Sequence, residues 1–155
     1  MQEFISFGIK WLPELLKGVP ITLSLWIIAI TLGFFLGLIL CWARVYGNRL
    51  FYWISTVYVE LFRGTPMLVQ MFFIYLGLPQ VGIVFDAFTA AVIAITLNSA
   101  AYQAEYFRGS VLSVPKGQIV AARACGMSQW QAIRHIMLPQ ALRRVIPQWS
   151  NEAII

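Results

Sequence analysis

The ionisable residues that could do chemistry in this chain occur in two near-identical pentapeptides, ELFRG at 60–64 and EYFRG at 105–109. Each places a carboxylate three residues ahead of an arginine, Glu60 with Arg63 and Glu105 with Arg108. On a helix this spacing brings the two side chains together, so an i, i+3 ion pair is one interpretation. The other is a polar lining or gate of a translocation path, because ionisable residues within a membrane face a bundle interior or a wet cavity.

Further polar side chains extend both pentapeptides into stripes at helical spacing. The stripes consist of Asn98, Tyr102 and Glu105 on one segment and of Arg63, Met67 and Gln70 on the other. Such groups can serve as hydrogen-bonding contacts between helices, worth about 0.6 kcal/mol on average in a membrane. Two facing stripes would also suit a small polar solute. The candidate path residues are therefore Glu60, Arg63, Gln70, Asn98, Tyr102 and Glu105.

The remaining reactive residue types do not form a catalytic or metal site. The sequence has no GxxxxGK[ST] phosphate loop. His135 is a lone histidine with no Ser or Asp partner at catalytic spacing, and Cys41 and Cys125 form no CxxC pattern. We therefore expect no catalytic residue, no metal and no bound cofactor in this chain.

The composition places these polar residues in a membrane. The chain is 60% hydrophobic and only 11% charged, with a mean hydropathy of +0.77, whereas soluble domains are about 25% charged. The net charge of +5 does not indicate nucleic acid, because the basic residues stand singly at the ends of apolar segments, where they act as topology signals. The expected fold class is an all-α, polytopic transmembrane helical bundle.

Three uncharged runs and a fourth apolar segment define the predicted spans. A span needs about 20 apolar residues. The runs cover residues 18–43, 64–85 and 87–104, and the fourth segment begins at 139. The second helix is expected to begin near Leu50, to be distorted at Pro66 and to end at 77–79. Gly33 and Gly37 form a GxxxG motif, which lets two helices approach closely. Residues 1–17 are expected to form an amphipathic lead-in to the membrane domain at 18–155.

The basic residues also predict the orientation. Most of them follow the first and third spans or precede the second, so the N-terminus is expected outside and the 109–144 segment in the cytoplasm. From Arg144 to Ile155 there are too few residues to cross a bilayer of about 30 Å. The chain is therefore expected to be truncated within its fourth core span, with a re-entrant or interfacial C-terminus as the alternative.

The cytoplasmic segment at about 113–139, called the 113–139 loop below, has its own pattern. Ser113 to Gly117 reads as a turn, and a short helix is expected from Gln118. Gly126 is placed where a helix end needs a left-handed backbone. Ser128 and Gln131 predict a capping box that begins a second helix, which Pro139 is expected to end. The pattern indicates a helix, a glycine elbow and a helix, with a plain amphipathic surface helix as the alternative.

These residues resemble a known family. Ala121-Ala122, Gly126, and then Ile136, Leu138 and Pro139 are similar in spacing to the EAA loop, EAA-x3-G-x9-I-x-LP, of ABC-importer permease subunits. Other stretches resemble the polar amino-acid uptake branch of that family: VELFRGTPMLVQMFFIYLGLP at 59–79, NSAAYQAEYFRG at 98–109, VPKGQ at 114–118 and LPQALRRVIPQWSNE at 138–152. The resemblance covers nearly the whole chain after about Gly18.

The resemblance implies a type I importer permease fold and a set of partners. In that family the loop docks into a cleft of a separate ATPase subunit, which binds ATP and Mg. A solute-binding protein delivers the amino acid on the outer face of the bacterial or archaeal inner membrane, and two permease subunits pair. The implied ATPase-coupling residues are Ala121, Ala122, Arg123, Ala124, Gly126, Ile136, Leu138 and Pro139.

The sequence departs from the family motif at one position and is compatible with two other functions. Val120 stands where the family usually has glutamate, so any polar contact from that position is in question. The rivals are a secondary transporter or channel that works without an ATPase, and a membrane adaptor without a solute path. The ordered 113–139 loop favours the ATP-driven importer, because neither rival needs such a loop.

Overall fold

The computed structural model describes residues 2–152, with side chains for 11–151, and over that range it consists of helices joined by short loops, with no strand. The helices are α1 (Gln2–Tyr46), α2 (Arg49–Gly64), α3 (Met67–Phe72), the π-helical turn η1 (Phe73–Gly77), the 3-10 turn η2 (Leu78–Val81), α4 (Ala87–Leu112), α5 (Lys116–Ala124), α6 (Gln129–Ala132), the π-helical turn η3 (Ile133–Met137) and α7 (Leu138–Glu152). The predicted all-α fold class is confirmed.

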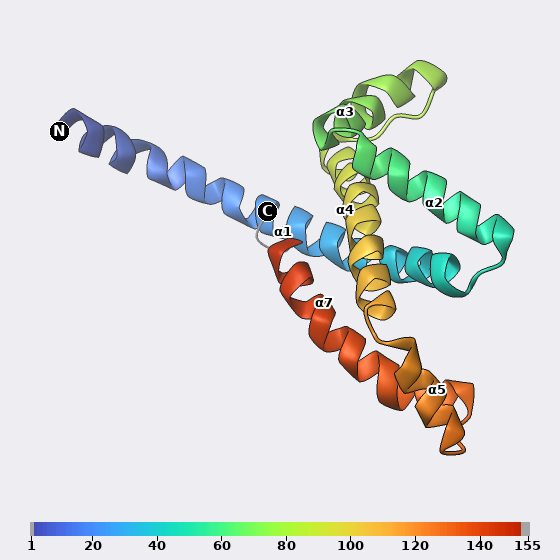
Figure 1. The fold of residues 1–155 in the computed structure, drawn as a ribbon. Coiled ribbons are helices and arrows are strands. Elements are labelled where there is room, and N and C mark those ends of the chain that lie inside the picture. Colours follow the sequence, from blue (N-terminus) through green and yellow to red (C-terminus); the bar gives the residue numbers. More distant parts are fainter. Residues whose placement is uncertain (1, 153–155) are drawn as a thin grey trace.

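Helices α1 and α4 form the frame of the molecule. Both are long and apolar enough to cross a membrane, and α4 packs across the second half of α1 (Figure 1). Within the predicted lead-in at 1–17, the described residues are helical and continue directly into the first span, since α1 runs from Gln2 to Tyr46. The helix that contains the predicted third span, 87–104, extends to Leu112.

The GxxxG motif lies where these two helices meet. A Cβ atom added at Gly37 would stand 3.0 Å from Gln103 Cβ and 3.2 Å from the Ala100 carbonyl oxygen. At Gly33 the nearest neighbour would be Gln103 Nε2 at 3.1 Å. The absence of side chains at these two positions therefore lets α1 and α4 approach closely, as the motif predicted.

The second predicted span is broken more sharply than expected. Helix α2 and the helical run Met67–Val81 together meet the criteria for a span, but they are bent by 105° at the break. Pro66 has no backbone N–H to continue the ladder, and it holds the preceding residue, Thr65, in the extended region at φ −115° and ψ 140°. The predicted distortion at Pro66 is confirmed, and it divides the helix expected from near Leu50 to 77–79 into α2 and the run Met67–Val81.

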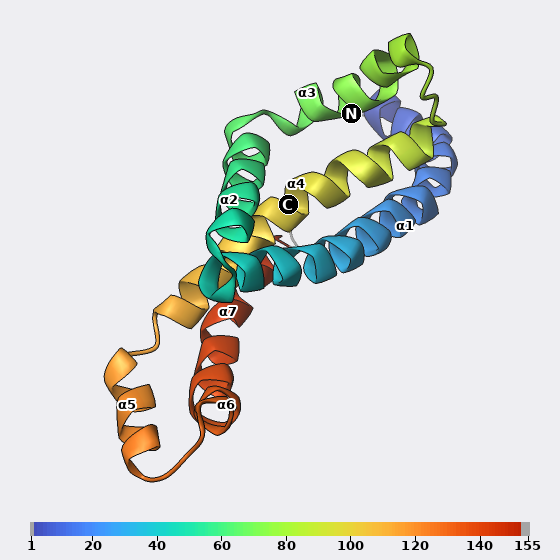
Figure 2. The same ribbon diagram turned by 90° about the vertical axis from the view of Figure 1, so that its right-hand side faces the viewer.

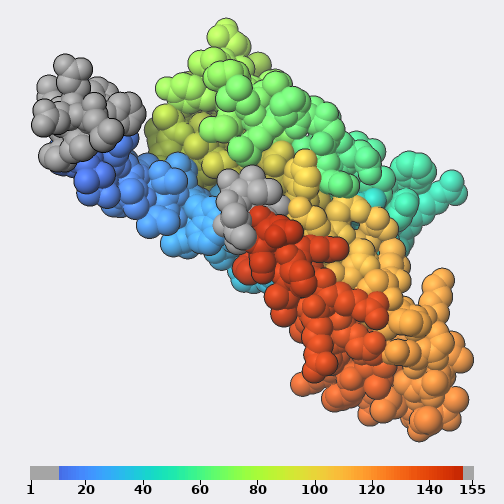
Figure 3. Space-filling model, turned by 60° about the vertical axis from the view of Figure 1, so that its left-hand side comes forward, coloured from blue at the N-terminus to red at the C-terminus, as the bar shows by residue number. Residues whose placement is uncertain are grey.

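The 113–139 loop projects from one end of the bundle as a separate lobe (Figure 2). Its expected helix, glycine and helix are present as α5, Gly126 and α6. The expectation that Pro139 ends the second helix is wrong. In η3 the Leu138 N–H donates to the Ile133 carbonyl, five residues back. This widened turn lets the helical path continue into α7 despite the proline. Figure 3 shows α7 and the loop forming one arm beside the bundle.

Candidate functional site

A partly buried ion-pair cluster joins the ends of α1 and α4. Arg108 Nε and Nη2 donate to the two oxygens of Glu105 at 3.0 and 2.7 Å, and Arg44 Nη1 donates to Glu105 from α1. The Arg44 side chain is only 7% exposed and that of Glu105 15%. The predicted pair of Glu105 with Arg108 is therefore present. Arg44, interpreted from the sequence as a topology signal, is its missed third member.

The other predicted ion pair does not form. Glu60 and Arg63 are both exposed and make no salt bridge with any described residue. Instead, the Arg63 guanidinium carbon lies over the Tyr102 ring, 5.3 Å from its centroid, which is a cation–π contact. The two pentapeptides thus have different environments: Glu105 is enclosed by arginines, whereas Glu60 is at the surface.

The two predicted polar stripes meet at Gln70 and Asn98. Asn98 Nδ2 donates to Gln70 Oε1 at 3.1 Å and to the Phe62 carbonyl at 3.2 Å. Gln70 Nε2 donates to the Phe62 and Thr65 carbonyls at 2.9 and 3.1 Å. The Phe62 and Thr65 carbonyls lie at the C-terminal end of α2, where the break at Pro66 leaves them without helical partners. Both amides therefore stabilise the broken helix and join it to α4.

Gln103 is a structural residue that the sequence analysis missed. It is fully buried. Its Nε2 donates to the Ile30 carbonyl of α1 at 3.3 Å, and its Oε1 accepts from Trp149 Nε1 of α7 at 2.9 Å. One α4 side chain therefore joins three helices. The available signal was a glutamine in an alanine-rich segment, opposite the predicted stripe.

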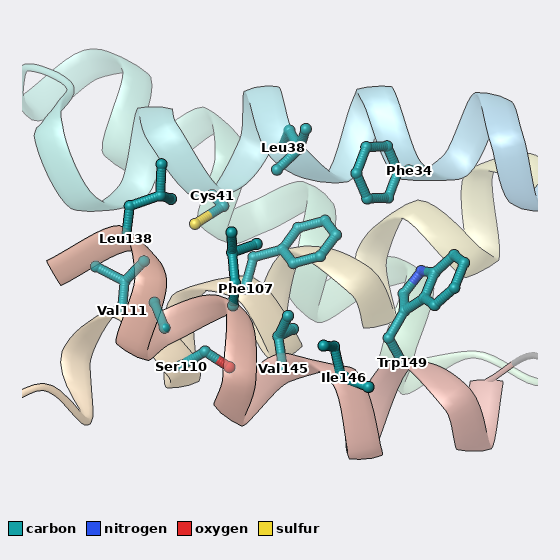
Figure 4. A pocket seen from close by; sticks show the side chains of 12 residues that line it. Phe34, Leu38, Cys41, Phe107, Ser110, Val111, Leu138, Val145, Ile146 and Trp149 are labelled. Carbon is teal, nitrogen blue, oxygen red and sulfur yellow. The ribbon is translucent and has the colours of Figure 1, made fainter. Parts of the chain in front are cut away.

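An apolar pocket lies elsewhere, between α1, α4 and α7. It has a volume of about 240 Å³. Figure 4 shows Phe34 and Leu38 of α1, Phe107 of α4 and Trp149 of α7 around it. This lining offers little to a polar solute, so the cavity is distinct from the polar stripes.

The 113–139 loop has a well-defined backbone at its glycine. Gly126 has φ +86°, the left-handed conformation that favours glycine. The Met127 N–H donates to the Ala122 carbonyl at 3.2 Å, and the Gly126 N–H to the Arg123 carbonyl at 3.0 Å. These two bonds form a Schellman motif. The Ser128–Gln131 capping box, also present, begins α6.

The predicted coupling residues divide into an outer and an inner group. The exposed ones are Ala121, Arg123, Ala124, Gly126, Leu138 and Pro139, whereas Ala122 is buried and Ile136 is partly buried. Two large apolar residues that were not among the predicted coupling residues are also exposed. Val120 is 67% exposed and Trp130 70%.

Comparison with known proteins identifies the family. Residues 16–154 match the family "Binding-protein-dependent transport system inner membrane component". The glutamine transport system permease protein GlnP of Escherichia coli K12 is 42% identical over 146 residues, which cover 93% of this chain and 67% of GlnP. The arginine transport system permease protein ArtQ of Bacillus subtilis is 39% identical over 150 residues, covering 96% of this chain and 68% of ArtQ.

Solved structures agree with these relatives. A crystal structure of an amino acid ABC transporter with histidines has a TM-score of 0.91 and 38% identity, covering 97% of this chain and 70% of that one. An inward-facing structure of the MetNI methionine ABC transporter has a TM-score of 0.71 and 25% identity, covering 94% and 70%. The chain spans about two thirds of the length of its curated relatives. It belongs to the inner membrane components of binding-protein-dependent transport systems and is an amino-acid ABC transporter permease.

Proposed function

We propose that this chain is part of the permease subunit of an ATP-driven importer for polar amino acids. It would form the translocation path and couple that path to a separate ATPase through the 113–139 loop. The observation that carries the proposal is the loop itself: two helices joined through a Schellman glycine, projecting from one end of the bundle. The likeness to the glutamine and arginine permeases supports the substrate class.

Coupling is proposed to work by alternating access. ATP with Mg binds in the partner ATPase and brings two such subunits together, and the docked loops then carry that movement to the spans. This mechanism requires that the spans have two stable arrangements and that the ATPase binds the loop more tightly in one arrangement than in the other. The loop can transmit movement because α7 follows η3 without a break in the helical path, and because Val114, Met137 and Ala141 form a common apolar core. The proposed coupling residues are Ala121, Ala122, Arg123, Ala124, Gly126, Ile136, Leu138 and Pro139.

The solute path is proposed to follow the polar stripes of α2, α3 and α4. Its candidate residues remain Glu60, Arg63, Gln70, Asn98, Tyr102 and Glu105, with different roles. Arg63 is exposed, lies over the Tyr102 ring and forms no salt bridge with a described residue, so it is available to meet a polar solute. Glu105 is enclosed by two arginines and is assigned a positioning role.

The partners follow from the same proposal. They are an ATP-binding ABC subunit, a second permease subunit, which makes a homo- or heterodimer, and an extracytoplasmic solute-binding protein. The subunit lies in the inner membrane with its N-terminus outside and the 109–144 segment in the cytoplasm. Six Lys or Arg residues and no acidic residue lie between Glu105 and Glu152, which supports this orientation under the positive-inside rule.

The test is uptake by the full-length subunit reconstituted with its ATPase and binding protein, using a panel of labelled polar amino acids. Gly126→Val is expected to abolish ATP-dependent uptake, because a β-branched residue is strained at φ +86°. Gly117→Val is the matched control: it lies in α5, and an added Cβ meets nothing within 4 Å. Uptake driven by an ion gradient without ATP, or full uptake by Gly126→Val, would contradict the proposal.

A further inference from the structure

The 113–139 loop carries only positively charged side chains. Its charged residues are Lys116, Arg123 and Arg134, all exposed, and the loop contains no Asp or Glu. Any protein surface that binds here must therefore provide the negative charge itself.

The fold presents apolar side chains beside these charges. Ile119 and Ala122, three residues apart on α5, face inward: Ile119 packs against the core of Val114, Met137 and Ala141, and Ala122 is 8% exposed. Val120 and Arg123, also three residues apart on α5, are both exposed, Val120 to 67%.

Trp130 supplies the second exposed apolar group. It lies in the first turn of α6 and is 70% exposed, although α6 is anchored by its capping box. Tryptophan and arginine are the residue types that most often dominate binding energy in protein interfaces, and the loop exposes Trp130, Arg123 and Arg134. A bilayer is a less suitable occupant, because the lobe extends away from the ends of α1 and α4 rather than along them (Figure 2).

We infer that this loop is a basic, apolar docking face for an acidic cleft on the ATP-hydrolysing partner, with Val120 and Trp130 as its apolar anchors. The inference rests on the proposed function, and it adds which kind of ATPase surface the loop would bind. Where related loops usually present a glutamate, this loop presents Val120. A partner whose cleft has a cation for that glutamate would meet an apolar side chain and three positive charges, and would be disfavoured.

The experiment uses the full-length subunit in nanodiscs and the ATP-hydrolysing subunit that co-purifies with it. Dissociation constants are measured at 50 and 500 mM NaCl. Val120→Glu is expected to weaken binding about tenfold at low salt, because it sets a carboxylate against an acidic cleft, and less at high salt, where charges are screened. Val120→Gln is the matched control for size and polarity without charge.

The apolar anchor has its own variant and control. Trp130→Ala is expected to weaken binding about tenfold or more at both salt concentrations. Trp53→Ala removes a similarly exposed tryptophan from α2, 55% exposed, and is expected to leave binding unchanged. The thermal midpoint of each variant checks the fold, which substitutions at exposed positions should preserve.

The possible failures are distinguishable. If the wild-type subunit binds its partner but Val120→Glu matches Val120→Gln or binds more tightly, the acidic-cleft inference is overturned while the proposed function stands. Unchanged binding by Trp130→Ala overturns the anchor assignment in the same way. If the wild-type subunit captures no ATP-hydrolysing subunit at all, the proposed function fails and this inference fails with it.

Discussion

Substitution of Gly37 by alanine should push α1 and α4 slightly apart and destabilise their packing. The new Cβ would stand 3.0 Å from Gln103 Cβ, 3.2 Å from the Ala100 carbonyl oxygen and 3.2 Å from the Ala104 nitrogen. Two of these atoms are backbone, and the third is the root of a fully buried side chain, so none can rotate away. Since non-bonded carbons prefer about 3.5–4.0 Å, α1 and α4 must move apart by roughly half an ångström.

The cost of that movement can be estimated. Inserting a methyl group into a well-packed interface costs about 1–3 kcal/mol. Replacing glycine by alanine within a helix also contributes up to about 1 kcal/mol of stability. Gly18→Ala is the control for this second effect, because Gly18 lies on the same helix and an added Cβ there meets nothing within 4 Å. The difference between the two variants therefore isolates the packing cost.

The measurement is the free energy of unfolding of the full-length subunit in mixed micelles, followed by circular dichroism as SDS is titrated. Gly37→Ala is expected to be about 1–3 kcal/mol less stable than Gly18→Ala. Gly33→Ala should lie between them, because its nearest neighbour is the end of the Gln103 side chain at 3.1 Å. Equal stabilities for Gly37→Ala and Gly18→Ala would refute the close approach of α1 and α4.

Two further substitutions test the charged groups. Glu105→Gln leaves Arg44 buried without its counter-charge and is expected to cost about 3 kcal/mol in the same unfolding assay; the double variant with Arg44→Gln should recover part of this loss, and equal losses would contradict the pairing. Hydrogen bonds from Thr89 hold the pKa of Asp86 below its ordinary value. This carboxylate therefore stabilises the fold above its ordinary pKa and loses that contribution as the pH falls through the lowered pKa. Asp86→Asn should remove this part of the acid sensitivity of the thermal midpoint; an unchanged pH profile would count against it.

The sequence predicted local features well because their causes are local. The capping box at Ser128, the left-handed glycine at 126 and the ion pair of Glu105 with Arg108 each depend on residues within five positions. The first and third predicted spans were similarly accessible, since α1 and α4 each contain an uncharged run long enough to cross a membrane.

The features that the sequence did not predict depend on how helices cross. The Arg44–Glu105 pair joins residues 61 positions apart, and the Gln103–Trp149 bond joins residues 46 apart. Neither can be read from periodicity on a single helix. The sequence also did not predict the direction of the chain after each proline. A bend of 105° occurs at Pro66, whereas the helical path continues through Pro139 after a π-helical turn. The outcome depends on whether neighbouring groups stabilise the altered backbone.

The two Glu–Arg motifs, at 60–64 and 105–109, have different contacts, and we therefore expect them to have different roles in the proposed path. A cationic solute group that competed for Glu105 would have to displace Arg44, whose side chain is only 7% exposed, and would leave that charge buried without a partner. Arg63 carries no such constraint, because it is exposed and forms no salt bridge with a described residue. Glu105 therefore holds α1 to α4, and in the proposed path Arg63 is the better candidate for contact with the solute.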